Sequence, residues 1–247
     1  DSGIPLRGVA SAFAQADGTS AVALTVALDA RTLPAPAGGE VVVTTSVFDP
    51  EGRAKGSFTQ QARLCAQPGW CEISVVLPMA TGRHALRVGL EHRPSGRSGS
   101  VYLDAVVPDF ARRGVWLTGL ALDVAPAGPR ATDAAVRTLL PIVPTTRREL
   151  ANSDRASVFF RIHQGSTRPV TAVSRTIQIT DENDTRVMDS TEVIPAASFA
   201  AGRMVEQRLA LPIAGLAPGR YLLTVSSRTG PSASASDERR QLVFVIK

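Results

Sequence analysis

Hydrophobic and polar positions alternate along most of this chain with a period of two. Val22, Leu24, Val26 and Leu28 alternate with alanines and a threonine, which is the pattern of a β-strand with one buried face. The same alternation recurs at 41–47, 86–90, 101–107, 158–162, 177–179, 223–225 and 242–246. Turns rich in Gly, Pro and Asp separate these runs, so the pattern predicts antiparallel sheets.

Helical periodicity is weak throughout the sequence. The best helix candidate is 132–140, with Thr132 as the N-cap and Pro141 ending the helix. The segment 115–124 is predicted to be a single strand that opens the second half of the chain. The expected fold is therefore almost entirely β.

Two stretches of the sequence resemble each other in order and spacing. Leu77-Pro78 leads to Gly82-Arg83, and Leu211-Pro212 leads to Gly219-Arg220, with offsets of 134 and 137 residues. Upstream, 47–52 corresponds to 179–184 at an offset near 132. Landmarks that recur at a nearly constant offset indicate an internal repeat.

The repeat and the alternation together predict the fold class and the domains. We expect an all-β chain of two tandem Ig-like (fibronectin-III-like) antiparallel β-sandwiches, at 1–110 and 111–247, joined by a short connector over 107–114. Tyr221, just after Pro218-Gly219, is expected to form the tyrosine corner of such a sandwich, and His84 takes the equivalent place in the first copy.

Composition and charge exclude several classes of function. The 247 residues are 44% hydrophobic and 20% charged, with a net charge of +5, which is a globular composition. No apolar run approaches eighteen residues, so no membrane insertion is expected, and any signal peptide is expected to be absent or already removed. Basic residues gather only in pairs, without a stripe interleaved with aromatics, so nucleic acid is not an expected partner.

Two cysteines lie close together, at Cys65 and Cys71, on either side of Pro68-Gly69. Pro-Gly suits the centre of a type II turn, so the cysteines are predicted to face each other across a hairpin and form a disulfide. Such a bond would indicate an oxidising compartment and would stabilise the fold by about 2 kcal/mol. Buried free thiols are the alternative.

The candidate chemistry is sparse. His84, His92 and His163 are the only histidines, and no Gly-x-Ser-x-Gly motif accompanies them, so a hydrolase is not expected. No cofactor is expected either.

The densest acidic group contains Asp181, Glu182 and Asp184. Its oxygens suit calcium, although an ordinary Asx turn explains the group equally well. Trp70, with Pro68 beside it, is the candidate binding residue for a glycan or peptide, and covering the disulfide is its alternative role.

Several short motifs resemble a family of exported proteins. They are Val107-Pro108-Asp109-Phe110, Leu117-Thr118-Gly119-Leu120, Pro144-Thr145-Thr146-Arg147-Arg148 and 219–225. These are similar to the C-terminal Ig-like region of acidobacterial VWFA-related secreted proteins. The Asp-x-Ser-x-Ser metal motif of the A domain is missing, so no metal-site residue carries over.

The sequence therefore predicts a non-catalytic, secreted or cell-surface tandem of sandwiches. Its expected role is to space, present or dock a neighbouring domain or protein partner. One alternative is a glycan- or peptide-binding module that uses the loops around Trp70. A self-assembling extracellular fibre subunit and an accessory domain of a hydrolase are the others, since sandwiches leave edge strands open to pairing.

Overall fold

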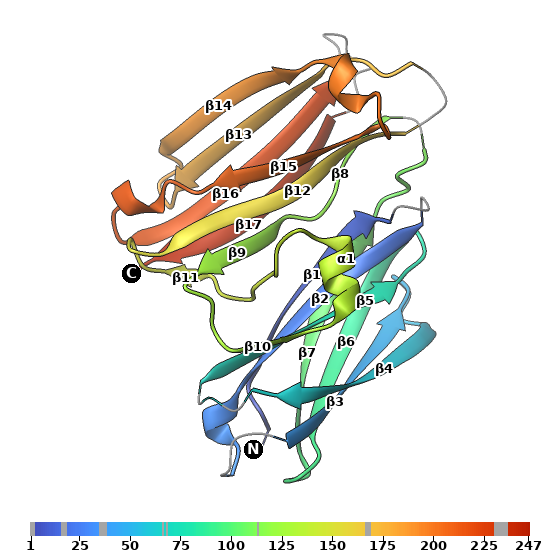
Figure 1. Cartoon of the computed structure of the whole chain (residues 1–247), viewed down its shortest axis with the longest axis vertical. Helices are drawn as coiled ribbons and strands as arrows, with labels where there is room; N and C mark the ends of the chain where they lie inside the picture. Colours follow the sequence, from blue (N-terminus) through green and yellow to red (C-terminus); the bar gives the residue numbers. More distant parts are fainter. Residues whose placement is uncertain are drawn as a thin grey trace. The chain divides into compact units, whose positions relative to one another are not determined.

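The computed structural model describes residues 3–15, 19–34, 39–65, 67, 69–112, 114–165, 169–229 and 237–247. The chain divides into two compact units (Figure 1). Unit 1 comprises Asp1–Val107 and Ala127–Thr146, and unit 2 comprises Pro108–Pro126 and Arg147–Lys247.

This division differs from the predicted domains 1–110 and 111–247, because the chain returns to unit 1 after it has begun unit 2. In the returning segment, β10 (Arg130–Thr132) pairs in parallel with β5 (Trp70–Pro78), and α1 (Ala134–Leu139) also contacts β5. The chain consequently passes between the units three times.

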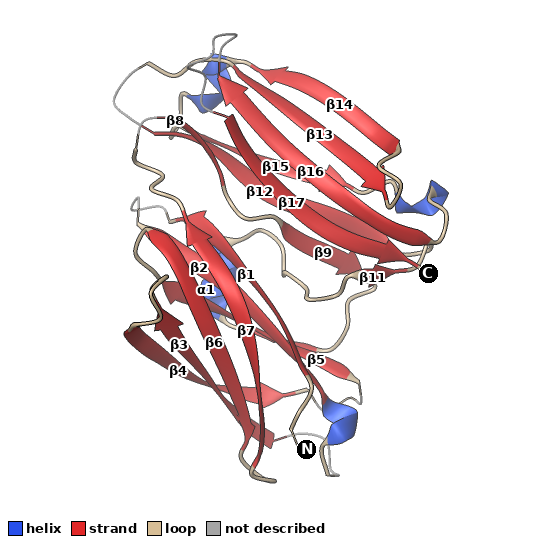
Figure 2. Cartoon of the chain, turned by 180° about the vertical axis from the view of Figure 1, so that it is seen from behind, coloured by secondary structure: helices blue, strands red, loops and turns tan. Residues whose placement is uncertain are grey.

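Unit 1 is a sandwich of two sheets (Figure 2). One sheet has the order β1-β2-β5-β10 and the other β4-β3-β6-β7. The further strands are β1 (Leu6–Ala14), β2 (Ser20–Asp29), β3 (Gly39–Phe48), β4 (Ala54–Leu64), β6 (Gly82–His92) and β7 (Arg97–Val107), and η1 (Ala30–Thr32) is a short 3-10 turn. The alternating apolar residues of β2, β3 and β6 form the buried core, as the sequence predicts.

Unit 2 is also a sandwich, with sheets β11-β17-β16-β13-β14 and β15-β12-β8, and β9 pairs with β12. Its strands are β8 (Gly114–Leu117), β9 (Ala121–Ala125), β11 (Glu149–Leu150), β12 (Arg155–Gly165), β13 (Val173–Asp181), β14 (Arg186–Ile194), β15 (Met204–Ala210), β16 (Gly219–Thr229) and β17 (Asp237–Ile246). The 3-10 turns η2 (Ala196–Phe199) and η3 (Ile213–Gly215) complete the unit. The fold class is therefore all-β, as predicted, with two mainly antiparallel sandwiches.

The prediction of a single strand over 115–124 is wrong. β8 and β9 are separated because Leu117 lies opposite Ile162 and Ala121 lies opposite Phe159, which leaves one extra residue on the 117–121 side. In the gap, the hydroxyl of Thr118 accepts a hydrogen bond from the N–H of Arg161 at 2.8 Å. The extra residue interrupts the ladder as a β-bulge does.

The helix exists, but its predicted N-cap is also wrong. Thr132 belongs to β10, and the carboxylate of Asp133 accepts a hydrogen bond from the N–H of Ala135 at 2.9 Å. Asp133 is therefore the N-cap, in the role that short polar side chains take at a helix start.

The two landmark turns found in the sequence have the same construction. Asp49 follows β3, and its carboxylate accepts hydrogen bonds from the N–H groups of Glu51 and Arg53. Asp181 ends β13, and its carboxylate accepts from the N–H groups of residues 183 and 185. The register of each hairpin shifts at a matching place, after Val47 in one unit and after Ile179 in the other.

Candidate functional site

Cys65 and Cys71 form a disulfide, with their Cα atoms 5.8 Å apart. The prediction that they face each other across a hairpin is wrong, because β4 pairs with β3 whereas β5 pairs with β2 and β10. Cys65 follows β4 and Cys71 lies in β5, so the bond ties one sheet of unit 1 to the other. A link between sheets constrains the sandwich itself rather than one hairpin tip.

Trp70 begins β5 and is half-buried. The guanidinium carbon of Arg7 lies 4.1 Å from the centre of a Trp70 ring, a cation–π contact that covers one face of the indole. Pro68, the other residue predicted to bind, lies outside the described residues. Binding through Trp70 stays a prediction.

The tyrosine corner is present in unit 2. The hydroxyl of Tyr221 donates a hydrogen bond to the carbonyl of Ala217 at 2.8 Å. In unit 1, the Nε2 atom of His84 lies 2.9 Å from the carbonyl oxygen of Ala80. Both side chains therefore make the same contact, to the residue four positions earlier, as their places in the two copies predict.

The acidic group at 181–184 folds as an Asx turn in which Asp181 binds backbone N–H groups. Asp184 takes a positive φ of 60°, a conformation that aspartate tolerates better than most residues. Within the described ranges, no three His, Cys, Asp or Glu side chains are grouped so that they could hold a metal ion. The calcium interpretation of Asp181, Glu182 and Asp184 therefore gains no support.

His92 is buried in β6, and His163 is half-buried in β12. The Nδ1 atom of His92 lies 2.7 Å from the hydroxyl of Ser95. Burial, helped by the nearby charge of Arg161, lowers the pKa of His163 to about 4. The rings of His163 and Phe110 lie 4.9 Å apart. His163 is therefore neutral at physiological pH, and its aromatic neighbour indicates a packing role.

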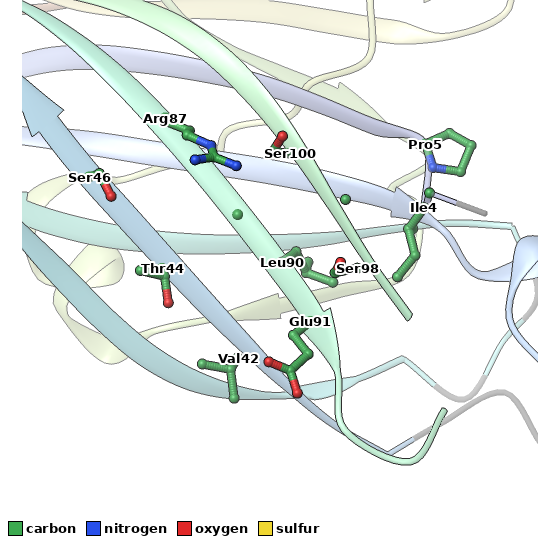
Figure 3. A pocket seen from close by; sticks show the side chains of 13 residues that line it. Ile4, Pro5, Val42, Thr44, Ser46, Arg87, Leu90, Glu91, Ser98 and Ser100 are labelled. Carbon is green, nitrogen blue, oxygen red and sulfur yellow. The ribbon is translucent and has the colours of Figure 1, made fainter. Parts of the chain in front are cut away.

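The candidate site that the structure offers is a hollow of about 680 Å³ on the outer face of β3, β6 and β7 in unit 1 (Figure 3). Its lining includes Val42, Thr44, Ser46, Arg87, Gly89, Glu91, Ser98 and Ser100, together with Gly3–Pro5 beside β7. Gly89 lies in the middle of β6, opposite Thr44 on one neighbouring strand and Ser100 on the other. Because Gly89 has no side chain, the sheet face is recessed at this position relative to the surrounding residues, which carry side chains.

The close approach of the N-terminal segment to β7 depends on a second glycine. The N–H of Ile4 donates to the carbonyl of Ser98 at 2.8 Å. A methyl group on Gly99 would lie 2.1 Å from the carbonyl oxygen of Ile4, so only glycine fits there. Gly3–Pro5 can therefore border the hollow.

Two opposite charges stand at the hollow, on either side of Gly89. Arg87 and Glu91 are both exposed, and among the described residues neither side chain has a hydrogen-bond or ion-pair partner. Tyr102, opposite Arg87 on β7, is 70% exposed. Sequence reasoning missed this group, although an outward-facing glycine inside a strand can signal close approach of a ligand.

Comparison with known proteins gives no family. No family model and no curated protein matches the chain. Among solved structures, it is similar to an adhesin of the CFA/I system of enterotoxigenic E. coli, CfaE, at 9% identity and a TM-score of 0.24, over 87% of this chain and 81% of the adhesin.

A β-glucuronidase from Parabacteroides merdae matches at 10% identity and a TM-score of 0.28, over 92% of this chain and 28% of the enzyme. At these scores neither likeness carries an argument about function.

Proposed function

We propose that this chain is a non-catalytic, exported tandem of Ig-like β-sandwiches that presents or docks a neighbouring domain or protein partner at the cell surface. The disulfide between Cys65 and Cys71 supports export, because such bonds persist mainly in oxidising compartments. No helix among the described residues is long and apolar enough to cross a membrane. The motif resemblance to VWFA-related secreted proteins agrees with this setting.

The observation that carries the proposal is the interleaving of the chain. Strands β8 and β9 belong to unit 2 but precede β10 and α1, which belong to unit 1. β10 pairs with β5 of unit 1, and β9 pairs with β12 of unit 2, so the chain supplies strands to unit 2, returns to unit 1 and then completes unit 2. Three passages of the chain therefore connect the two sandwiches, which supports a structural role. The matching Asp turns and the matching corner contacts support the proposal of a tandem repeat, which this return of the chain would modify.

Cleavage at one site tests the interleaving. A protease site inserted after Gly128, which is exposed, would divide the chain into two fragments. We expect the fragments to elute together under native conditions and to separate in denaturant, since the strand pairs β10–β5 and β9–β12 hold them. A matched protease site in the exposed turn after Gly52 lies within unit 1 and should behave in the same way. Separation of the Gly128 fragments in native buffer would contradict the proposal.

Location and redox state test the rest of the proposal. In fractions of the source organism, an antibody against this chain should find it outside the cytoplasm, with both cysteines resistant to alkylation until reduction. A cytoplasmic protein with reactive thiols would overturn the export proposal. A band well above the mass of this chain would support presentation of a neighbouring domain, whereas a band at its own mass would favour an autonomous binding or assembling role.

A further inference from the structure

We propose that unit 1 binds a neutral glycan in the hollow over Gly89, on the outer face of β3, β6 and β7 (Figure 3). This site is separate from Trp70, and the proposal goes beyond the presenting role. It rests on a comparison of the two units, on the unpaired charges and on the exposed tyrosine.

Unit 2 has a position that corresponds to Gly89, and it carries a side chain. Thr44 shares a hydroxyl contact with Thr59 on β4, and Thr176 shares one with Thr191 on β14. Gly89 pairs with Thr44, and Ser226 of β16 pairs with Thr176. Ser226 therefore occupies in unit 2 the position of Gly89 in unit 1. On the other side, Gly89 is opposite Ser100, whereas Ser226 is opposite Arg239.

The neighbouring positions in unit 2 are satisfied by cross-strand pairs. Gln241 donates a hydrogen bond to the hydroxyl of Thr224 at 3.2 Å. Arg228 forms an ion pair with Asp237 at 3.8 Å. On the face of β16 and β17, these side chains are therefore paired with each other across the two strands.

At the corresponding positions in unit 1, the facing side chains of the described strands form no hydrogen bond or ion pair with each other. Arg87 and Tyr102 replace the Thr224–Gln241 pair, and Glu91 and Ser98 replace the Arg228–Asp237 ion pair. Arg87 and Glu91 lie four residues apart on one strand, about 13 Å between Cα atoms, with Gly89 midway. Their charged groups flank a space that an external molecule can occupy.

The side chains around the hollow match the hydroxyl groups of a sugar. Arg87 supplies only donors and Glu91 only acceptors, while Thr44, Ser46, Ser98 and Ser100 supply hydroxyls that do both. A sugar hydroxyl also donates and accepts, so it can bind every member of this set. One arginine against one glutamate leaves no excess charge, which disfavours a phosphate or another polyanion.

Tyr102 is not one of the residues that line the hollow, but it lies opposite the lining residue Arg87 and adds an apolar surface next to it. Its ring is 70% exposed and is paired with Arg87 across the two strands. Aromatic rings in binding sites combine a flat apolar face with a polar tip. A sugar ring likewise presents C–H groups on its faces and hydroxyls on its edges.

The backbone of the site disfavours an extended peptide. Strand addition needs a free sheet edge, but Gly89 lies on β6, which pairs with both β3 and β7. β7 ends this sheet, and beside the hollow its Ser98 carbonyl already accepts the N–H of Ile4. The floor of the hollow consequently offers side chains rather than free N–H and C=O groups. Recognition at Gly89 therefore relies on hydroxyls and charges, with the Tyr102 ring next to Arg87.

The experiment screens the full chain on an array of neutral oligosaccharides built from hexoses and N-acetylhexosamines, and measures affinity for the strongest binder by titration calorimetry. Gly89→Val fills the hollow, and the fold should tolerate it, because an added Cβ would meet only the carbonyl oxygen of Thr44, at 3.7 Å. We expect Gly89→Val and Tyr102→Ala each to weaken binding by about tenfold or more. Thermal unfolding of each variant checks that it folds.

The matched control is Ser226→Val, which places the same side chain at the corresponding position of unit 2. We expect it to leave the affinity unchanged. Glycan binding that survives Gly89→Val but is lost in Trp70→Ala would overturn this site in favour of Trp70. An array that shows no neutral glycan bound, or binding only to acidic polymers, would also overturn the proposal.

Discussion

The carboxylate of Glu72 accepts a hydrogen bond from the backbone N–H of Thr146 at 2.6 Å, although 74 residues separate them in sequence. The hydroxyls of Thr145 and Thr146 donate to the same Oε1 atom at 2.7 and 2.8 Å. Glu72 lies on β5 and is buried. A buried carboxylate needs such donors, and the returning segment supplies these three.

Unit 1 is therefore expected to need residues 127–146. A fragment ending at residue 110 loses β10, α1 and the donors to Glu72, so it should be much less stable than the same unit in the full chain. Joining 1–107 to 127–146 through a flexible Gly-Ser linker should restore a cooperative transition. Urea unfolding followed by circular dichroism compares the two. Equal stability of both fragments would show that the returning segment contributes little.

The disulfide is expected to stabilise unit 1 alone. Replacing both Cys65 and Cys71 with alanine should lower the free energy of unfolding of that unit by about 2 kcal/mol, since the bond closes a short loop. Adding reductant to the wild-type protein should produce the same loss and leave the alanine variant unchanged. Differential scanning calorimetry with and without reductant measures both effects, and a shift in the unit 2 transition would contradict the assignment.

His163 is expected to make unit 2 sensitive to acid. Its folded pKa of about 4 lies below the ordinary value of 6.5, so the unfolded chain binds a proton more readily between those values. Stability is then complete above about pH 6.5 and falls as the pH drops toward 4. At pH 4.5 the loss should be about 2 to 3 kcal/mol relative to pH 7.5.

His163→Gln should remove most of that pH dependence. Denaturant unfolding of the wild type and the variant at the two pH values measures the difference, and an NMR titration of the imidazole gives the pKa itself. A His163 that titrates near 6.5 in the folded protein would show this explanation to be wrong.

The corner hydrogen bond of unit 2 should contribute measurably to stability. Tyr221→Phe removes the hydroxyl that binds Ala217 but keeps the ring, whose centre lies 5.5 Å from that of Phe244. We expect a loss of about 1 kcal/mol. Tyr102→Phe is the matched control, because its hydroxyl is on an exposed side chain, and it should change stability by less than about 0.5 kcal/mol. Equal effects in thermal unfolding would exclude a special role for the corner.

The sequence by itself determined the strands and their buried faces. Alternation is a local property, so Val22, Leu24, Val26 and Leu28 could be assigned to the core from their spacing, and all four are fully buried. The tyrosine corner was equally predictable, because Tyr221 and its acceptor are only four residues apart. The paired turns at Asp49 and Asp181 were found for the same reason.

Only the tertiary structure decided which strands pair and where the chain returns. Every strand offers the same backbone groups, so pairing depends on long-range packing that no short motif records. That is why β5 joins β2 rather than β4, and why Cys65 and Cys71 link two sheets instead of closing a hairpin. The hollow at Gly89 could not be predicted from the sequence for the same reason. Its walls come from three strands, and their register is set only when the sheet forms.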